Sequence, residues 1–95
     1  MRIELSPYLA GDLEAIGDFI ALDKPMRAAS FIREIRGKFR KIAEGPLHYR
    51  LRPDIGPEAR VAVHGNYLIL FRVVASVVRI ERVIHGGRDI PLLFE

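Results

Sequence analysis

The sequence contains no cysteine. This absence excludes disulfide bonds, cysteine-based zinc fingers and catalysis by a thiol, and nothing in the composition indicates an oxidising compartment. Long apolar runs are also missing. The first residues, MRIELSPYLAG, hold no run of signal-peptide length, and no segment approaches the roughly 20 apolar residues of a membrane span. These absences predict a soluble, cytoplasmic protein that does not contact a membrane.

The residues that are present predict one folded domain over residues 1–95. Hydrophobic residues make up 49% of the chain, which is enough for a real core and tells against disorder. The net charge is +3, and eight basic residues crowd one quarter of the chain against only Glu34 and Glu44. They are Arg27, Arg33, Arg36, Lys38, Arg40, Lys41, Arg50 and Arg52. Such a cluster suits a nucleic acid or an acidic protein segment, and it suits a solvated helix face equally well.

The first half of the chain predicts a short strand and two helices. Arg2 to Leu5 alternates polar and apolar residues, as a strand does. Ser6-Pro7 and Asp23-Lys24-Pro25 are typical helix starts, with Ser6 and Asp23 as the expected caps. Apolar residues then recur at helical spacing, and the two stripes are expected to form the core of an antiparallel hairpin. The stripes are Leu9, Leu13, Ile16, Phe19 and Ile20, then Met26, Ala29, Ile32, Ile35, Phe39 and Ile42.

The second half predicts three strands after an irregular segment from residue 47 to residue 58. The strands are Arg60 to His64, Tyr67 to Val74 and Val77 to Ile84. Turns at Gly65-Asn66 and Ala75-Ser76 join them. Helices followed by a run of strands indicate an α+β fold with a mostly antiparallel sheet.

Polar residues gather where the last strand ends. His85, Gly86, Gly87, Arg88 and Asp89 are consecutive, and Arg82 precedes them. In a functional interpretation His85 is a general acid or base, and the arginines hold phosphate. In a structural interpretation His85 bonds to the Gly-Gly turn, Arg88 and Asp89 form ion pairs, and Ile90, Leu92, Leu93 and Phe94 dock on the core.

Two further sets of polar residues have weaker functional signals. Arg72, Arg79 and Glu81 are expected to form cross-strand pairs. His48 and His64 lack the spacing of metal ligands, and the sequence predicts neither a metal site nor a cofactor.

Five segments, taken in order, resemble the ParE toxins of the RelE/ParE superfamily, which belong to type II toxin–antitoxin (plasmid stabilisation) systems. They are L-S-P-x-L-x-x-D-L from Leu5, D-K-P from Asp23, R-x-R-P from Arg50, N-Y-L-I-L-F-R-V from Asn66 and R-V-I-H-G-G-R-D from Arg82. The resemblance covers nearly the whole chain. It implies a helical hairpin packed on a curved antiparallel sheet.

The same resemblance separates two activities. RelE-like members are similar to ribosome-dependent mRNA endonucleases, whereas ParE-like members poison DNA gyrase without an evident catalytic centre. RelE-like members tend to carry an arginine directly after the strand tyrosine and another tyrosine near the C-terminus. Here Leu68 follows Tyr67, and no tyrosine follows it. This departure favours a non-enzymatic gyrase inhibitor.

The resemblance also implies partners and candidate residues. A cognate antitoxin with an acidic or apolar tail is expected to wrap this chain in a higher-order hetero-oligomer, and the antitoxin rather than this chain is expected to bind operator DNA. The predicted partner-binding residues are Arg33, Arg36, Arg40, Arg50, Arg52, Arg60, Arg82 and Arg88. If the protein is instead a nuclease, the expected catalytic residues are Arg60, Arg82, His85 and Arg88. A third hypothesis is a toxin that has lost its toxicity and only titrates antitoxin.

Overall fold

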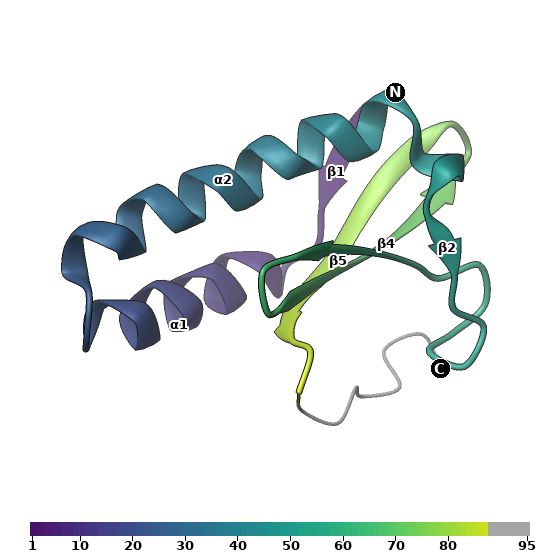
Figure 1. Cartoon of the computed structure of the whole chain (residues 1–95). Helices are drawn as coiled ribbons and strands as arrows, with labels where there is room; N and C mark the ends of the chain where they lie inside the picture. The colour runs from purple at the N-terminus through teal and green to yellow at the C-terminus, as the bar shows by residue number, and fades with distance from the viewer. Residues whose placement is uncertain (88–95) are drawn as a thin grey trace.

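A five-stranded sheet packs against a helical hairpin in the computed structural model, which describes residues 1–87 (Figure 1). The strands are β1 (Arg2–Leu5), β2 (Arg50–Leu51), β3 (Arg60–His64), β4 (Tyr67–Val74) and β5 (Val77–His85). The helices are α1 (Leu9–Ala21), α2 (Pro25–Glu44) and a short 3₁₀ turn at Pro46–His48. The expected α+β architecture is therefore confirmed. Residues 88–95, which include the expected apolar tail, Arg88 and Asp89, lie outside the described part.

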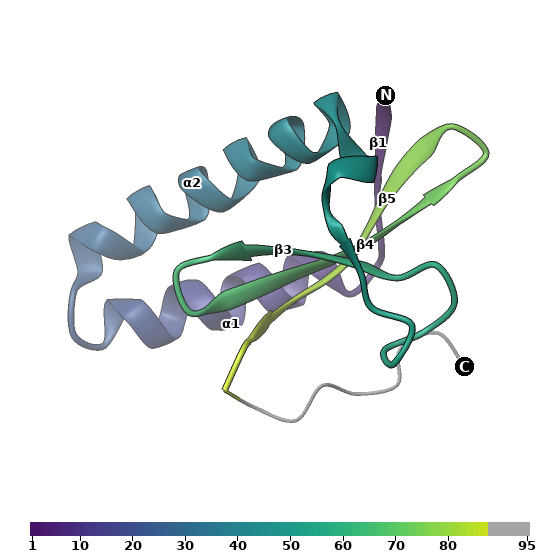
Figure 2. The same ribbon diagram turned by 45° about the vertical axis from the view of Figure 1, so that its right-hand side comes forward.

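The sheet has the order β1-β5-β4-β3-β2. β1 pairs in parallel with β5, and every other neighbouring pair is antiparallel, so the sheet is mostly antiparallel as predicted. Figure 2 shows the hairpin of α1 and α2 on one side of this sheet. The two-residue strand β2 was not predicted, because the segment around it reads as irregular.

Neither predicted helix cap is used as a cap. α1 begins at Leu9 after a turn, and the Ser6 hydroxyl donates instead to the carbonyl oxygen of Glu81 on β5. α2 begins at Pro25, and Lys24 rather than Asp23 precedes it, without a side-chain cap bond. Pro25 is the first residue of α2, a position where a helix needs no N–H, whereas Pro7 lies in the turn before α1.

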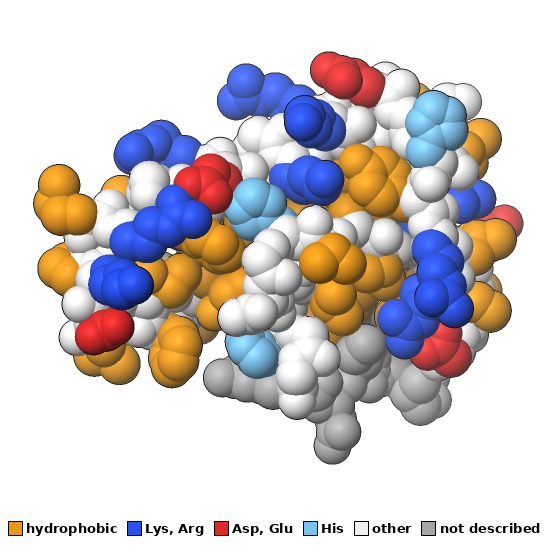
Figure 3. Space-filling model, in the orientation of Figure 1, with side chains coloured by type: hydrophobic (Ala, Val, Ile, Leu, Met, Phe, Trp, Pro, Cys, Tyr) orange, Lys and Arg blue, Asp and Glu red, His pale blue; other side chains and the backbone are white. Residues whose placement is uncertain are grey.

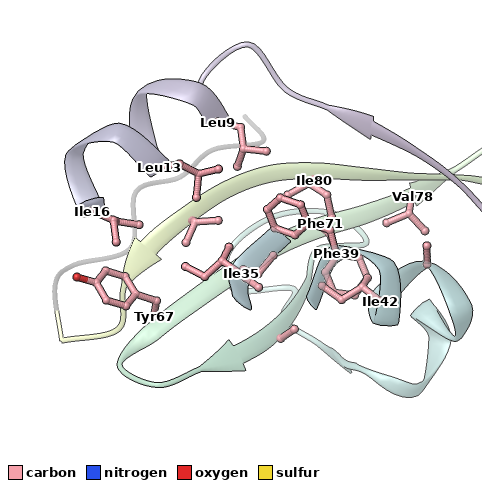
Figure 4. Packing of buried hydrophobic residues seen from close by; sticks show 14 of the residues in the cluster. Leu9, Leu13, Ile16, Ile35, Phe39, Ile42, Tyr67, Phe71, Val78 and Ile80 are labelled. Carbon is pink, nitrogen blue, oxygen red and sulfur yellow. The ribbon is translucent and has the colours of Figure 1, made fainter. Parts of the chain in front are cut away.

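The core lies between the hairpin and the sheet (Figure 4). Side chains from both helices, β4 and β5 fill it, among them Leu9, Leu13, Ile16, Phe31, Ile35, Phe39, Ile42, Tyr67, Ile69, Phe71, Val78, Ile80 and Val83. Three predicted core residues are wrong: Phe19 is 59% exposed, Met26 is 88% exposed, and Ala29 is exposed as well. The hairpin extends past the edge of the sheet at its loop, so no strand within residues 1–87 covers Phe19 or Met26 (Figure 1).

A smaller apolar cluster covers the other face of the sheet. Ile55 and Ala59, from the loop between β2 and β3, are buried with Leu70 of β4. Leu68 and Ile84 pack beside them, and the two are cross-strand partners in the register. Both faces of β4 are therefore partly buried, which explains its nearly continuous apolar sequence.

The expected turn between β4 and β5 is confirmed, and it is strained. Ala75 and Ser76 have φ angles of 49° and 63°. Positive φ at both central residues is the pattern of a type I′ hairpin turn, which favours Asn-Gly. We expect Ala75→Asn combined with Ser76→Gly to raise the free energy of unfolding by about 1 kcal/mol, because Asn and Gly adopt positive φ more easily. Urea denaturation followed by circular dichroism measures the change. The β-branched variant Ala75→Val should lower the urea midpoint, and a valine that raised it would contradict the explanation.

Candidate functional site

The end of β5 is held to the start of α1 by polar contacts. β1 ends at Leu5 opposite Ile80, and the register between β4 and β5 shifts by one residue, which leaves Glu81 as a β-bulge. Beyond Ile80, no strand within residues 1–87 pairs with the outer edge of β5. The Ser6 N–H donates to the Ile80 carbonyl at 2.9 Å, and the Val83 N–H donates to Asp12 Oδ2 at 3.1 Å. The backbone of Ser6 and the side chain of Asp12 therefore bond to β5 where a neighbouring strand would otherwise do so.

Asp12 also holds Arg82 in a two-pronged ion pair. Arg82 Nε donates to Asp12 Oδ2 and Nη2 donates to Oδ1, each at 2.7 Å. The side chains are only 26% and 10% exposed, respectively, and the guanidinium lies 5.3 Å from the centre of the Tyr8 ring. The hydrogen bonds with Asp12 raise the pKa of Arg82 above its ordinary value. The bidentate edge that Arg82 would offer to a phosphate is thus engaged within the fold.

His85 is the last residue of β5 and bonds to the turn that follows it. The Gly87 N–H donates to His85 Nδ1 at 3.0 Å. The imidazole stands edge-on to the Tyr67 ring, with 5.4 Å between centroids. Because Nδ1 accepts this bond, the neutral ring carries its proton on Nε2. This hydrogen bond is the one that the structural interpretation of His85 predicted.

Arg60 and Arg52 bind neighbouring parts of the chain. Arg60 Nη1 donates to the Tyr49 carbonyl at 2.6 Å, which fastens the segment before β2 to β3. Arg52 donates to both carboxylate oxygens of Asp54, at 2.9 and 2.7 Å. These bonds raise the pKa of Arg52 and lower the pKa of Asp54.

The residues expected for a nuclease are not assembled in the part of the chain described. Arg60 lies opposite Phe71 on one side of β4, whereas Arg82 and His85 lie on β5 at its other side. Arg60 turns to the segment before β2 and Arg82 turns to α1. Arg88 falls outside residues 1–87. Within those residues, no group of three His, Asp or Glu side chains comes together as a metal site would require.

A family model described as "ParE toxin of type II toxin-antitoxin system, parDE" matches residues 3–90. The chain belongs to this ParE toxin family. Among curated protein sequences, none matches it significantly.

Two solved structures share the fold of this ParE-family chain. A chain from the chromosomal ParDE toxin–antitoxin system of P. aeruginosa superposes with a TM-score of 0.77 at 22% identity, over 90% of this chain and 95% of that one. A chain from the toxin–antitoxin complex RelBE2 of Mycobacterium tuberculosis superposes with a TM-score of 0.60, also at 22% identity, over 88% and 95%. At this identity the likeness concerns the fold.

The basic residues of the ParE-family chain fall into two groups. Arg52, Arg60 and Arg82 bind partners inside the fold, as described above. Four of the predicted partner-binding residues form neither a hydrogen bond nor an ion pair with residues 1–87: Arg33, Arg36, Arg40 and Arg50. All four are exposed, and Figure 3 shows basic side chains spread along the face that includes α2. These four are the arginines that the described fold leaves available to a partner.

Glu34 neutralises the beginning of the basic cluster. Arg27 makes a two-pronged ion pair with it, and His64 Nε2 lies 3.1 Å from Glu34 Oε1. The hydrogen bonds from Arg27 and then His64 lower the pKa of Glu34. One of the expected cross-strand pairs forms, since Arg72 on β4 lies 3.6 Å from Glu81 on β5. Arg79 pairs instead with Glu81 on its own strand, at 2.7 Å, and lies 3.4 Å from Glu4 on β1.

Sequence reasoning did not identify Asp12 as the partner of Arg82 and of the Val83 N–H. Asp12 is the aspartate of the first of the five family-like segments, and that segment is the sequence feature that could have pointed to it.

None of the helices within residues 1–87 combines the length and the hydrophobicity needed to cross a bilayer.

Proposed function

We propose that this ParE-family chain is a toxin that binds DNA gyrase and thereby blocks replication, without catalysing a reaction of its own. The observation that carries the proposal is the pair between Asp12 and Arg82. An endonuclease of the expected kind needs Arg82 to stabilise a charged phosphorane. Here the Nε and Nη2 edge of its guanidinium is already occupied by the Asp12 carboxylate, at 2.7 Å for each bond.

The residue after the strand tyrosine supports the same choice. Leu68 stands where RelE-like members tend to carry arginine, and it packs with Leu70 and Ile84 in the apolar cluster on the outer face of the sheet. A charged side chain placed there would have to leave this cluster or lose its hydration. The surface suits contact with a protein better than contact with a phosphate.

We also propose a cognate antitoxin as the cytoplasmic partner, with an acidic or apolar tail and assembly into a larger hetero-oligomer. The exposed arginines Arg33, Arg36, Arg40 and Arg50 would attract such a tail. β1 and β2 are edge strands of the sheet, and an extended tail segment would cover an edge of this kind. In this proposal the antitoxin, rather than this chain, binds operator DNA.

Supercoiling by purified gyrase tests the proposal, with this protein refolded free of antitoxin. Inhibition together with accumulation of cleaved DNA supports it, and an equimolar antitoxin tail should then restore supercoiling. A folded protein that arrests growth and leaves gyrase unaffected would contradict it. Ribosome-dependent mRNA cleavage in that case would favour the nuclease alternative, and harmless induction without antitoxin would indicate a toxin that has lost its activity.

His85→Ala separates the two activities directly. If His85 only closes the turn at the end of β5, gyrase inhibition should stay within about two-fold of the wild type, as for other surface substitutions. Dose–response curves for supercoiling, with growth arrest measured in parallel, give the comparison. His85→Gln is the matched control, because its amide can still accept the bond from Gly87. Loss of growth arrest together with RNA cleavage would assign His85 to nuclease catalysis.

A further inference from the structure

A pocket of about 310 Å³ lies where the loop end of the hairpin meets the turn between β3 and β4. Aromatic rings form much of its wall: Phe19 of α1, Phe31 of α2 and Tyr67 of β4. The Phe31 and Tyr67 rings lie 5.5 Å apart between centroids, tilted by 59°. Pockets that bind small molecules usually enclose about 300–1,000 Å³, so this one suits a molecule of one or two fused rings.

Polar groups without a partner line the same pocket. The Tyr67 hydroxyl, the Asn66 side-chain amide and Nε2 of His85 form no hydrogen bond with any group of residues 1–87. Figure 4 shows the Tyr67 hydroxyl directed away from the apolar core. Because Nδ1 of His85 accepts the bond from Gly87, Nε2 of the neutral ring is a donor. The amide and the hydroxyl can each donate and accept.

The one cation of the pocket wall is already neutralised. Arg27 lines the pocket, but both of its terminal nitrogens bond to Glu34, and its guanidinium lies 5.2 Å from the centre of the Phe31 ring. No carboxylate is found among the lining residues in the described part of the chain. An anion would have to compete with Glu34 for Arg27, and a cation would find no counter-charge, so the pocket favours an uncharged occupant.

We propose that this pocket binds the base of a free nucleoside. A nucleobase is planar and uncharged, so its faces stack on aromatic rings while its edge carries donors and acceptors close together. The aromatic walls and the three neutral hydrogen-bonding groups complement both features. A hydrocarbon ring would leave those groups without partners. The pocket takes no part in the proposed contact with gyrase, and the inference does not depend on gyrase being the target.

Titration of the full chain, free of antitoxin, with adenosine, guanosine, cytidine and uridine tests the site. Two-dimensional NMR of the backbone amides follows the binding. We expect at least one nucleoside to saturate the protein with a Kd of about 0.1–1 mM, the range of a small ligand with few polar contacts. The largest shift changes should centre on Phe31, Gly65 and Asn66, which line the pocket.

Three variants show whether the base lies in this pocket. Phe19→Ala should raise the Kd at least about five-fold, because it removes a ring on which the base stacks. Tyr67→Phe keeps the ring and removes the hydroxyl, and it should raise the Kd by about 2- to 10-fold. Leu22→Ala is the matched control: Leu22 is 86% exposed just beyond Phe19 and does not line the pocket, so the Kd should stay within about two-fold.

The spectrum of each variant without ligand shows whether the fold is kept. No saturable binding of any of these nucleosides up to about 10 mM would overturn the proposal. An unchanged Kd in both Phe19→Ala and Tyr67→Phe would overturn it as well, because the base would then bind elsewhere. Benzoate that fills the pocket at a lower concentration than every nucleoside would assign the site to an aromatic acid instead. Binding of a tetranucleotide but of none of its nucleosides would assign it to nucleic acid, and either result excludes the free nucleoside.

Discussion

Replacing Asp12 with alanine should lower the free energy of unfolding by about 3 kcal/mol, because it strips a largely buried arginine and a strand N–H of their acceptor at once. The Arg82 guanidinium would lose both 2.7 Å bonds, and the Val83 N–H would lose its bond at the uncovered edge of β5. For a domain of this size the melting temperature should fall by roughly 15 °C. Urea and thermal denaturation followed by circular dichroism measure both quantities.

Asp18→Ala is the matched control for this prediction. Asp18 is an exposed carboxylate on the same helix and has no ion-pair partner in the described range, so its loss should change the stability by less than about 0.5 kcal/mol. Similar losses from the two variants would show that the pair with Arg82 contributes nothing beyond a surface charge.

A double variant distinguishes the pair from its members. Asp12→Leu with Arg82→Met removes both charges and keeps apolar volume at both positions. We expect the double variant to lose less stability than the two single variants lose in sum. Each single variant leaves one unpaired charge in the fold, whereas the double variant leaves none. A strictly additive result would mean that Asp12 acts mainly through the Val83 N–H. The toxicity of Arg82→Met should then follow its stability, since Arg82 belongs to the fold.

The strands were predictable because their signal is local. The alternation of Arg60 to His64 predicts β3 with the bounds that the structure shows, and the apolar run from Tyr67 to Val74 does the same for β4. Gly65-Asn66 contains residues that suit a two-residue connection, whereas Ala75-Ser76 is marked only by the two apolar runs on either side of it. Neighbouring residues carry this information, so no knowledge of distant contacts is needed.

The roles of individual polar residues were not predictable in the same way. Asp12 and Arg82 are 70 positions apart, and only the folded chain brings them together. Ser6 has the right place and type for a helix cap, yet its hydroxyl binds a strand carbonyl. A sequence presents all arginines as equivalent cations, whereas the fold engages Arg52, Arg60 and Arg82 and leaves Arg33, Arg36, Arg40 and Arg50 exposed.

The bulge at Glu81 explains why the last strand reads irregularly. Strict alternation would place Ile80 and Val83 on opposite faces, yet both are buried in the same core. One extra residue in β5 corrects the phase. In the sequence, the bulge shows as two adjacent polar residues, Glu81 and Arg82. The change of phase also places Arg82 where it can bind Asp12.

Phe71→Ala should reduce the free energy of unfolding by about 3–5 kcal/mol, the usual cost of emptying the site of a buried aromatic ring. Phe71 is fully buried at the centre of β4 (Figure 4). Its ring is nearly perpendicular to that of Tyr49, with 5.6 Å between the two centroids. The free energy of unfolding of a small domain is only about 5–15 kcal/mol in total, so the variant should be close to unfolding and unable to inhibit its target. Urea denaturation of the antitoxin-free protein measures the loss.

Phe19→Ala is the matched control, since it removes the same ring from a side chain that is 59% exposed. Its cost should stay below about 1 kcal/mol, because most of the ring already meets water. The sequence places Phe19 in a helical apolar stripe and Phe71 in an apolar strand, and the reach of the hairpin beyond the sheet explains why only Phe19 is exposed. If both variants lost the same amount of unfolding free energy, Phe19 would have to be buried, and the end of α1 beyond the sheet would then belong to the core.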